Sequence, residues 1–303
     1  MDKIGSVTID TTYFTGQNRY SDGLIEHELL QLVRQAQPDF RTALSQDRRW
    51  PLLYHLTPLR RNLLEWYPFD ARGNILEIGA GCGALTGLFC EKAAQVVALE
   101  LSRLRAEIIA WRYREKSNLQ VVVGDLLDTC LATTFDYVTL IGVLEYATGA
   151  ADDAARFRRL LDKARSYLKP DGVLLVALEN KYGLKYWAGA PEDHTGVLFD
   201  GLQGYRGDVA VRTFSRAELE TMLKDSGFHD LTFYYPVPDY KLPVEIFSDA
   251  NLPRYGQCPT GATYSASRLA VFDEDRVRNT IIDSGDFAFF ANSFLVCCRQ
   301  GTP

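Results

Sequence analysis

The sequence lacks long apolar runs, and its first residues contain little that is apolar. Its longest apolar stretches, such as residues 172–178, are far shorter than the roughly 20 residues that a membrane-spanning helix needs. The opening residues, MDKIGSVTID, contain no apolar stretch like that of a secretory signal peptide. We therefore expect a chain without a membrane span that works in the cytoplasm.

Cysteine pairs with metal-binding or disulfide spacing are also missing. The six cysteines show no CxxC spacing and no nearby histidine cluster. Zinc sites and disulfide frameworks usually show such regular spacing. We therefore expect reduced thiols and no bound metal. The residues concerned are Cys82, Cys90, Cys130, Cys258, Cys297 and Cys298.

An excess of positive charge is absent as well. The chain has 39 acidic and 33 basic residues, which gives a net charge of −6. Proteins that bind nucleic acid strongly usually have a basic surplus that neutralises phosphates. We therefore expect no nucleic-acid partner. The 303 residues, of which 47% are apolar, suit a globular protein with one large domain or one domain and a small lobe.

The pattern of apolar residues changes near residue 70. Before it, residues 24–35 and 58–66 have helical spacing, which predicts a helical cap over residues 1–70. After it, short β-branched segments alternate with helical segments, which predicts one main domain over residues 71–303. Two irregular stretches, 180–212 and 241–287, are long enough to be functional loops or insertions.

The alternation predicts an α/β fold with a doubly wound, mostly parallel, seven-stranded sheet. Ligands bind such sheets at the carboxyl ends of the strands. The expected strands are 74–78, 95–99, 119–123, 135–141, 173–178, 231–235 and 293–298. The expected helices between them are 84–92, 103–116, 156–168 and 215–223.

Three acidic or glycine-rich signals follow three successive predicted strands. Residues 77–83 (EIGAGCG) lie between a strand and a helix, where glycines let a ligand approach the backbone. Glu100 ends the next strand, where a carboxylate can accept both hydroxyls of a ribose. Asp125 ends the third strand and can accept an adenine amino group. The loop also fits a loose dinucleotide pattern with Ala84 as its last small residue, so a nicotinamide-dependent oxidoreductase is an alternative.

These residues resemble the class I S-adenosylmethionine-dependent methyltransferases. The resemblance covers residues 76–83, Glu100, Asp125, the segment 135–145 and the segment 168–173 in the same order. It implies a Rossmann-like methyltransferase fold, an EC 2.1.1 enzyme and S-adenosyl-L-methionine as cofactor. It also implies that the glycine loop holds the methionine part, Glu100 the ribose and Asp125 the adenine. The implied cofactor residues are Glu77, Gly79, Ala80, Gly81, Gly83, Glu100, Leu101, Asp125, Leu126 and Gly142.

The flanking segments indicate the acceptor. Residues 50–59 and 179–196 are similar to a bacterial subgroup associated with surface-polysaccharide and secondary-metabolite pathways. The segment 141–146 (IGVLEY) lacks the Asp/Asn-Pro-Pro-Tyr/Phe motif of enzymes that methylate exocyclic amines. We therefore expect a small-molecule or saccharide acceptor that is methylated at a hydroxyl oxygen. An N- or carboxyl-methyltransferase and a non-catalytic cofactor-binding module in a polysaccharide assembly are alternatives, and a homodimer is compatible with the sequence.

A hydroxyl acceptor must lose its proton during the attack on the methyl group. His194 follows the fifth predicted strand, and we expect it to be the general base, with Asp193 or Glu192 as its orienting partner. The alternative is a loop histidine bonded to backbone. Four aromatic residues are expected near the acceptor or, alternatively, in the packing of the loop. They are Tyr146, Tyr182, Tyr186 and Trp187.

The cap also contains residues that could contact a cofactor. Tyr13, Tyr20 and Asp22 could close over it, because aromatic faces attract the sulfonium cation. Ordinary packing of the cap is the alternative for the tyrosines. His55 could line the same side of the cofactor, and a packed helix histidine is its alternative.

Overall fold

The computed structural model describes residues 1–16, 23–35, 39–146, 153–206, 211–259, 268 and 270–301, without the side chains of residues 153 and 154. The predicted cap residues Tyr20 and Asp22, and parts of the loops 180–212 and 241–287, lie outside them. The chain forms two compact units, which are described separately. The first comprises residues 1–140 and 163–172, and the second comprises residues 141–162 and 173–303.

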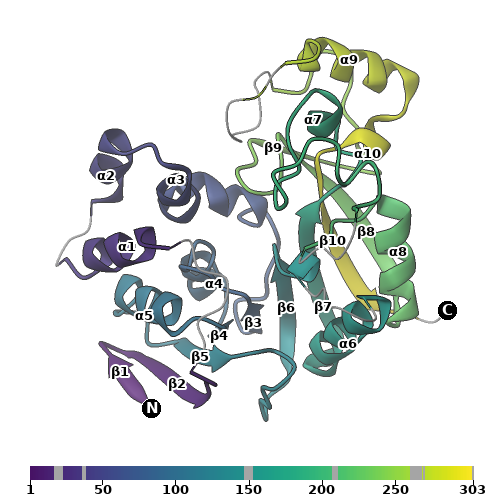
Figure 1. Ribbon diagram of the computed structural model, residues 1–303. Helices are drawn as coiled ribbons and strands as arrows, with labels where there is room; N and C mark the ends of the chain where they lie inside the picture. Colours follow the sequence, from purple (N-terminus) through teal and green to yellow (C-terminus); the bar gives the residue numbers. More distant parts are fainter. Residues whose placement is uncertain are drawn as a thin grey trace. The chain divides into compact units, whose positions relative to one another are not determined.

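The first unit is built on parallel strands in the order β1-β2-β5-β4-β3-β6 (Figure 1). All neighbouring pairs from β2 to β6 are parallel, and only β1 runs antiparallel to β2. The inner strands are almost fully buried, which explains why they appear in the sequence as continuous apolar runs. The strand bounds are β1 (Asp2–Ile4), β2 (Val7–Tyr13), β3 (Asn74–Ile78), β4 (Gln95–Glu100), β5 (Leu119–Gly124) and β6 (Phe135–Ile141).

Helices connect and cover these strands. The helix α5 begins after the cap residue Ser102, whose hydroxyl accepts the backbone N–H of Arg105. Glu26 at the start of α1 forms an ion pair of 2.7 Å with Arg105, so α1 is fixed to α5 by charge as well as by packing. The helical bounds are α1 (Ile25–Val33), α2 (Phe40–Gln46), α3 (Trp50–Leu56), η1 (Pro58–Leu63), α4 (Thr86–Lys92) and α5 (Arg103–Arg112).

The N-terminal segment differs from the purely helical cap that we expected. It begins with the hairpin β1–β2, and β2 lies parallel to β5 with Tyr13 opposite Gly124. A Cβ atom at Gly124 would lie 2.6 Å from the Cβ of Tyr13, so only glycine allows this close approach. The hairpin thereby brings the N-terminus to the strand that ends just before Asp125.

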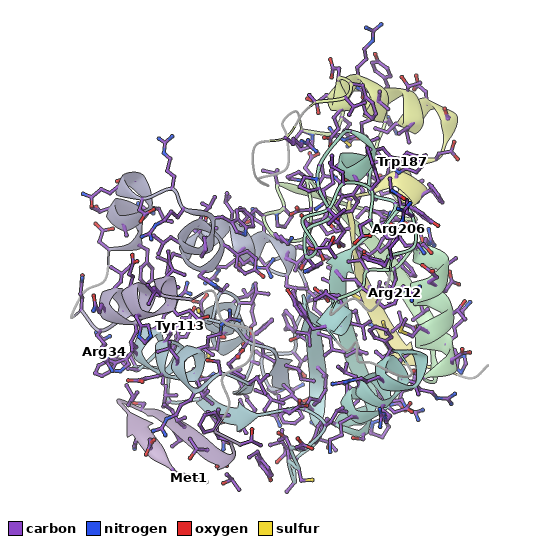
Figure 2. All side chains as sticks on the ribbon, viewed as in Figure 1. Met1, Arg34, Tyr113, Trp187, Arg206 and Arg212 are labelled. Atoms are coloured by element: carbon purple, nitrogen blue, oxygen red, sulfur yellow. The ribbon has the colours of Figure 1, made fainter. Side chains whose placement is uncertain are left out.

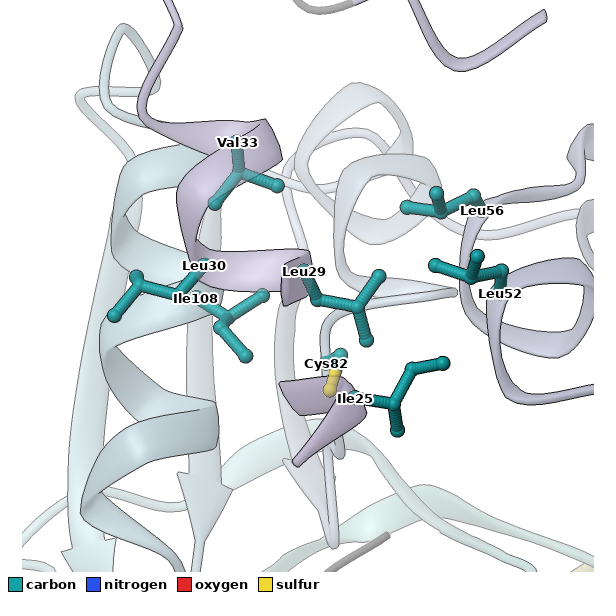
Figure 3. Packing of buried hydrophobic residues seen from close by; sticks show 8 residues of the cluster. All are labelled: Ile25, Leu29, Leu30, Val33, Leu52, Leu56, Cys82 and Ile108. Atoms are coloured by element: carbon teal, nitrogen blue, oxygen red, sulfur yellow. The ribbon is translucent and has the colours of Figure 1, made fainter. Parts of the chain in front are cut away.

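An apolar cluster joins the cap helices to the glycine loop (Figure 3). Cys82 of that loop packs among residues from α1, α3 and α5. The position of the glycine loop therefore depends on the packing of the first sixty residues. The buried members are Ile25, Leu29, Leu30, Val33, Leu52, Leu56, Cys82 and Ile108.

The second unit is built on antiparallel strands in the order β7-β10-β8-β9. Its helix α8 begins with the predicted capping box, in which Ser215 and Glu218 satisfy each other's backbone N–H groups. The strand bounds are β7 (Leu168–Glu179), β8 (Phe228–Val237), β9 (Glu245–Ser248) and β10 (Ser293–Gln300). The helical bounds are η2 (Leu144–Tyr146), α6 (Asp153–Ser166), α7 (Leu184–Trp187), α8 (Arg216–Asp225), α9 (Glu274–Ser284) and α10 (Phe287–Phe290).

The expected strands and helices between residues 74 and 179 are confirmed, with small differences at their ends. The described residues form ten strands where seven were expected, because β1, β2 and β9 were missed. The stretch 241–287, which was expected to be irregular, contains the strand β9 and the helix α9, whose first turn follows the cap residue Asp273. In the part of the chain that the structure describes, no helix has the length and apolar character needed to cross a bilayer.

Substitution in the apolar cluster provides a test of how α1 is held. Leu29 is fully buried in α1, whereas Leu24, at the beginning of the same helix, is 82% exposed. We expect Leu29→Ala to lower the free energy of unfolding by about 2–5 kcal/mol, because it leaves a cavity. Leu24→Ala should change it by less than about 0.5 kcal/mol. Urea unfolding followed by circular dichroism measures both, and equal effects of the two substitutions would contradict this packing.

Candidate functional site

The glycine loop after β3 bends back through three residues with positive φ. These angles are 70° at Gly79, 56° at Gly81 and 79° at Gly83. A Cβ atom at Gly83 would lie 2.9 Å from the ring of Tyr113, which is labelled in Figure 2, so this glycine is needed for packing. At Gly81 the nearest atom to a Cβ would be His55 Cε1, at 4.0 Å. Gly81 thus leaves room for a ligand to approach the loop.

Glu100 at the end of β4 is fixed by backbone donors. Its Oε2 accepts the N–H of Gly81 at 2.7 Å, and its Oε1 accepts the N–H of Ser102 at 2.9 Å. The side chain is only 5% exposed, and burial raises the pKa of its carboxyl despite the nearby Arg105. Each oxygen keeps a further lone pair, so the carboxylate can still accept the two hydroxyls of a ribose.

Asp125 lies in the turn that follows β5. Its Oδ1 accepts the N–H of Leu127 at 2.9 Å, which fixes the turn, and its side chain is half-buried. Leu126 is buried and Leu101 is partly buried at neighbouring strand ends. Tyr13 lies beside this edge and donates its hydroxyl hydrogen to the carbonyl of Cys130 at 2.6 Å.

The first unit therefore brings together most of the predicted cofactor residues. The segments 77–83, 100–101 and 125–126 all lie at the carboxyl ends of β3, β4 and β5, which are neighbours in the sheet. Gly142 belongs to the second unit and is described with it. His55 is buried, with its ring edge-on to Tyr54, and lies beside Gly81, so it fits both readings that the sequence left open.

Glu77, within β3, is a buried carboxyl that favours its neutral form. Its Oε2 accepts the hydroxyl hydrogen of Thr86 at 2.5 Å, and the residue is 5% exposed. Burial raises the pKa of Glu77 to about 8, and this effect outweighs the opposing effect of the Thr86 hydrogen bond. At neutral pH this position therefore contributes a protonated carboxyl to the start of the glycine loop.

A second group of candidate functional side chains lies within the second unit. Glu145 comes from η2, Glu179 ends β7, and His194 lies in the loop that follows α7. One oxygen or nitrogen atom of each lies within 4.8 Å of the other two. Gly142, with φ of 69°, precedes Glu145, and a Cβ there would lie 3.0 Å from the hydroxyl of Tyr240.

Buried ion pairs surround this group. Lys241 Nζ lies 2.5 Å from Glu179 Oε1 and 3.2 Å from Asp193 Oδ2. Lys185 Nζ lies 2.5 Å from the same oxygen of Asp193, which also accepts the hydroxyl hydrogen of Tyr186. Burial raises the pKa of a carboxyl, but Lys241 and His194 outweigh it and hold the pKa of Glu179 well below its usual range. The network thus keeps Glu179 and Asp193 ionised inside the unit.

The contacts of the His194 imidazole differ from the expected ones, in which Asp193 or Glu192 orients the ring. Glu192 Oε2 accepts the backbone N–H groups of His194 and Thr195, each at 2.7 Å, while Asp193 pairs with lysines. The ring itself faces Tyr146, with 3.3 Å between Nδ1 and the hydroxyl oxygen, and Glu179, with 3.5 Å between Nε2 and Oε2. Glu192 therefore orients the loop, and Tyr146 and Glu179 contact the ring.

The charges around His194 determine its protonation. Burial alone would lower its pKa, but the carboxylates of Glu179 and Glu145 outweigh burial and raise the pKa of His194 to about 9. Burial and the charge of Glu179 raise the pKa of Glu145 to about 8. At neutral pH the imidazole is therefore protonated in this state, and a role as general base requires it to release that proton first.

The remaining predicted aromatic residues have distinct environments. Tyr182 stacks on Phe289 with 5.3 Å between the ring centroids, and Tyr186 is buried. Trp187 is 43% exposed and donates its indole N–H to the carbonyl of Tyr182 at 3.2 Å. Their contact with an acceptor stays a prediction. No local motif in the sequence marks Lys185, Glu179 and Lys241, whose contacts in this network include residues from segments distant along the chain.

Comparisons with known proteins find similarity to methyltransferases in part of the chain. Residues 76–174 match a family model described as a methyltransferase domain. The ribosomal RNA small subunit methyltransferase A of Streptococcus equi subsp. zooepidemicus is 36% identical over 77 residues, which are 25% of this chain and 27% of that protein. The protein of the same name from Streptococcus pneumoniae is 37% identical over 76 residues, with 25% and 26% covered. The chain thus spans about a quarter of the length of the curated relatives that it matches.

One solved structure shows the fold. The CcbJ methyltransferase from Streptomyces caelestis superimposes with a TM-score of 0.50 at 16% identity, and covers 82% of this chain and 95% of that chain. The Rossmann-like methyltransferase fold is therefore confirmed. Residues 76–174 are therefore similar to a methyltransferase domain, and the fold around them is one that a known methyltransferase also has.

Gly81 provides a test of the cofactor position. We expect Gly81→Ala to weaken binding of S-adenosyl-L-methionine at least about tenfold, because the added Cβ projects where the ligand approaches the loop. The positive φ should also cost about 1–2 kcal/mol of stability. Titration calorimetry and urea unfolding measure the two effects.

A matched control for this variant is Gly204→Ala. Gly204, in the second unit, has φ of 81° and no heavy atom within 4 Å of an added Cβ. An alanine there should therefore be strained in its backbone much as an alanine at Gly81 is. It should lower stability similarly and leave cofactor affinity unchanged. Unaltered affinity in Gly81→Ala would show that the ligand does not approach this part of the loop.

The raised pKa of Glu77 implies that the free energy of unfolding depends on pH. Its folded-state pKa of about 8 lies above the usual value of 4.5, so its contribution is complete in acid and is lost as the pH rises through 8. Between pH 6 and pH 9, Glu77→Gln should therefore lose roughly 2 kcal/mol less unfolding free energy than the parent. Urea unfolding at both pH values measures this. The control Glu91→Gln, an exposed partner of Arg61, should match the parent's loss, and a parallel pH response of Glu77→Gln would refute the assignment.

Proposed function

We propose that this protein transfers a methyl group from S-adenosyl-L-methionine to a hydroxyl oxygen of a small-molecule or saccharide acceptor. The observation on which the donor assignment depends is the arrangement at the ends of β3, β4 and β5. There Gly81 leaves room for a ligand, Glu100 is fixed by two backbone N–H groups, and Asp125 follows on the next strand. Methyl transfer from a sulfonium needs mainly alignment and exclusion of water, which such a fixed site can supply.

The acceptor class follows from charge and from the second unit. The net charge of −6 and the absence of an Asp/Asn-Pro-Pro-Tyr/Phe motif disfavour a nucleobase. The buried carboxylates and the imidazole of the second unit are suited to hydrogen bonds with hydroxyl groups. The resemblance of the segment 179–196 to a polysaccharide-associated subgroup supports a saccharide.

Methylation of ribosomal RNA is the second candidate. Its support is the similarity to the ribosomal RNA small subunit methyltransferase A of two streptococci. That similarity covers about a quarter of either protein, and it favours a shared donor-binding segment more than a shared acceptor. An N- or carboxyl-methyltransferase and a non-catalytic binding module are the remaining alternatives.

His194 remains the residue that we propose for the acceptor's proton. It is buried beside Glu179 and Tyr146, which hold the ring in one orientation. As a base it would remove the hydroxyl proton while the oxygen attacks the methyl carbon and the donor's carbon–sulfur bond breaks. His194→Ala should then lose methyl transfer and keep its affinity for S-adenosyl-L-methionine.

A labelling experiment tests the proposed function. The purified protein is incubated with S-adenosyl-L-methionine labelled in its methyl group and with three fractions of a bacterial extract: small metabolites, saccharides and ribosomal RNA. We expect label in the metabolite or saccharide fraction, with release of S-adenosylhomocysteine in equal amount, because the chain has no basic surplus for RNA.

The outcomes separate the candidates. Label in RNA alone would replace the proposed acceptor by the second candidate. Binding of S-adenosyl-L-methionine in calorimetry without any transfer would favour the non-catalytic module, and binding of NAD instead would overturn the donor assignment. The variant Gly81→Ala serves as the control that lacks the donor site.

A further inference from the structure

The donor set in the second unit has the composition of a metal site. Glu145, Glu179 and His194 offer two carboxylate oxygens and one imidazole nitrogen, all within 4.8 Å of one another. Around an ion with bonds of about 2.1 Å, ligand atoms lie roughly 3–4.2 Å apart. A small inward movement of these side chains therefore brings all three atoms to bonding distance.

Glu145 is the observation that points to a missing ligand. The residue is 0% exposed, and neither of its carboxylate oxygens has a hydrogen-bond partner among the described residues. Within the same described part of the chain, it forms no ion pair with a lysine or arginine. A buried carboxyl without a partner is unfavourable unless a ligand or a cation satisfies it.

His194 is oriented as metal-binding histidines are. Its Nδ1 lies 3.3 Å from the hydroxyl of Tyr146, and its Nε2, which has no hydrogen-bond partner among the described residues, faces Glu179. In metal sites the second ring nitrogen usually contacts an oxygen that fixes the ring while the first nitrogen binds the ion. Tyr146 is in the position to do this for His194.

The neighbouring lysines do not balance all of the negative charge around Glu145 and Glu179. Lys241 lies between Glu179 and Asp193, and Lys185 pairs with Asp193 and lies 3.9 Å from Asp239, so these two lysines face three carboxylates. Lys241 contacts Oε1 of Glu179, while Oε2 faces His194. His194 must be neutral to bind a metal ion, and once it has released its proton the carboxylate of Glu145 and the second oxygen of Glu179 remain for another positive charge.

We infer that Glu145, Glu179 and His194 bind a divalent cation of the Mg²⁺ and Mn²⁺ type. Carboxylates suit these hard cations, and a single imidazole is compatible with Mn²⁺. Three protein ligands leave coordination positions open for oxygen atoms of a substrate. The cysteine and histidine spacing on which we based the expectation of no metal does not detect a set of this kind.

Mn²⁺ titration followed by electron paramagnetic resonance tests the site. After treatment with a chelator, the full chain should bind about one Mn²⁺, and the pulsed spectrum should show coupling to one imidazole nitrogen. Glu145→Gln and His194→Gln should each weaken binding at least about tenfold, and His194→Gln should lose the nitrogen coupling. Both replacements keep the size of the side chain approximately.

The control is Glu220→Gln, which removes an exposed carboxylate of α8 that pairs with Lys224 in the same unit. It should bind Mn²⁺ as the parent does. Absence of Mn²⁺ binding, binding without nitrogen coupling, or equal affinity in Glu145→Gln and the parent would each overturn the proposal. If a variant does not fold, judged by its near-ultraviolet circular dichroism, the nitrogen coupling of the parent decides.

The use of this ion in methyl transfer rests on the proposed function, whereas its binding does not. A bound divalent cation would make a coordinated hydroxyl more acidic and would use His194 as a ligand, so the role of base proposed for His194 applies to the protein without the ion. Mn²⁺ binding without affinity for S-adenosyl-L-methionine would keep the site and reject the function. Methyl transfer by chelator-treated protein that does not bind Mn²⁺ would reject the metal site and keep the proposed function.

Discussion

The hydrogen bonds that Glu100 accepts from Gly81 and Ser102 fix the part of the first unit that we propose for binding the methyl donor. They join the end of β4 to the glycine loop after β3 and to the first residue before α5. The carboxyl is buried, and its two N–H donors reduce the cost of ionising it there without removing that cost, so that its pKa stays raised. The same group that would hold a ribose therefore also sets the shape of the loop beside it. Cofactor recognition and local folding depend on one side chain.

The fold between residues 74 and 179 could be predicted because each of its signals is local. A buried parallel strand is a run of apolar residues, and the glycine or acidic residue that follows it marks its end. The strand β2 was missed because its sequence, VTIDTTY, is mostly polar and its partner β5 lies over a hundred residues away. Only the tertiary contact between Tyr13 and Gly124 shows why this segment is extended.

The two groups of candidate functional residues also differ in whether local sequence signals mark them. Glu77, Glu100 and Asp125 were found because each occupies a fixed place after or within its own strand. The role of Lys241 could not be found, because its partners Glu179 and Asp193 come from other segments of the second unit. The protonation of His194 was also beyond the sequence, since two carboxylates that are distant along the chain outweigh its burial. Sequence reasoning can name a titratable residue but cannot sum the charges that surround it.

The two units use different kinds of interaction at their candidate sites. This difference limits what similarity to other proteins can indicate about the acceptor. The residues of the first unit that we propose for donor binding offer mainly backbone N–H groups and glycines, which many sequences can supply in one fold. The second unit instead relies on buried ionised side chains, whose replacement leaves a charge without a partner. The match to the methyltransferase domain ends at residue 174, before Glu179, His194 and Lys241. Similarity over that segment therefore supports the methyl donor, whereas the acceptor must be inferred from the charges of the second unit itself.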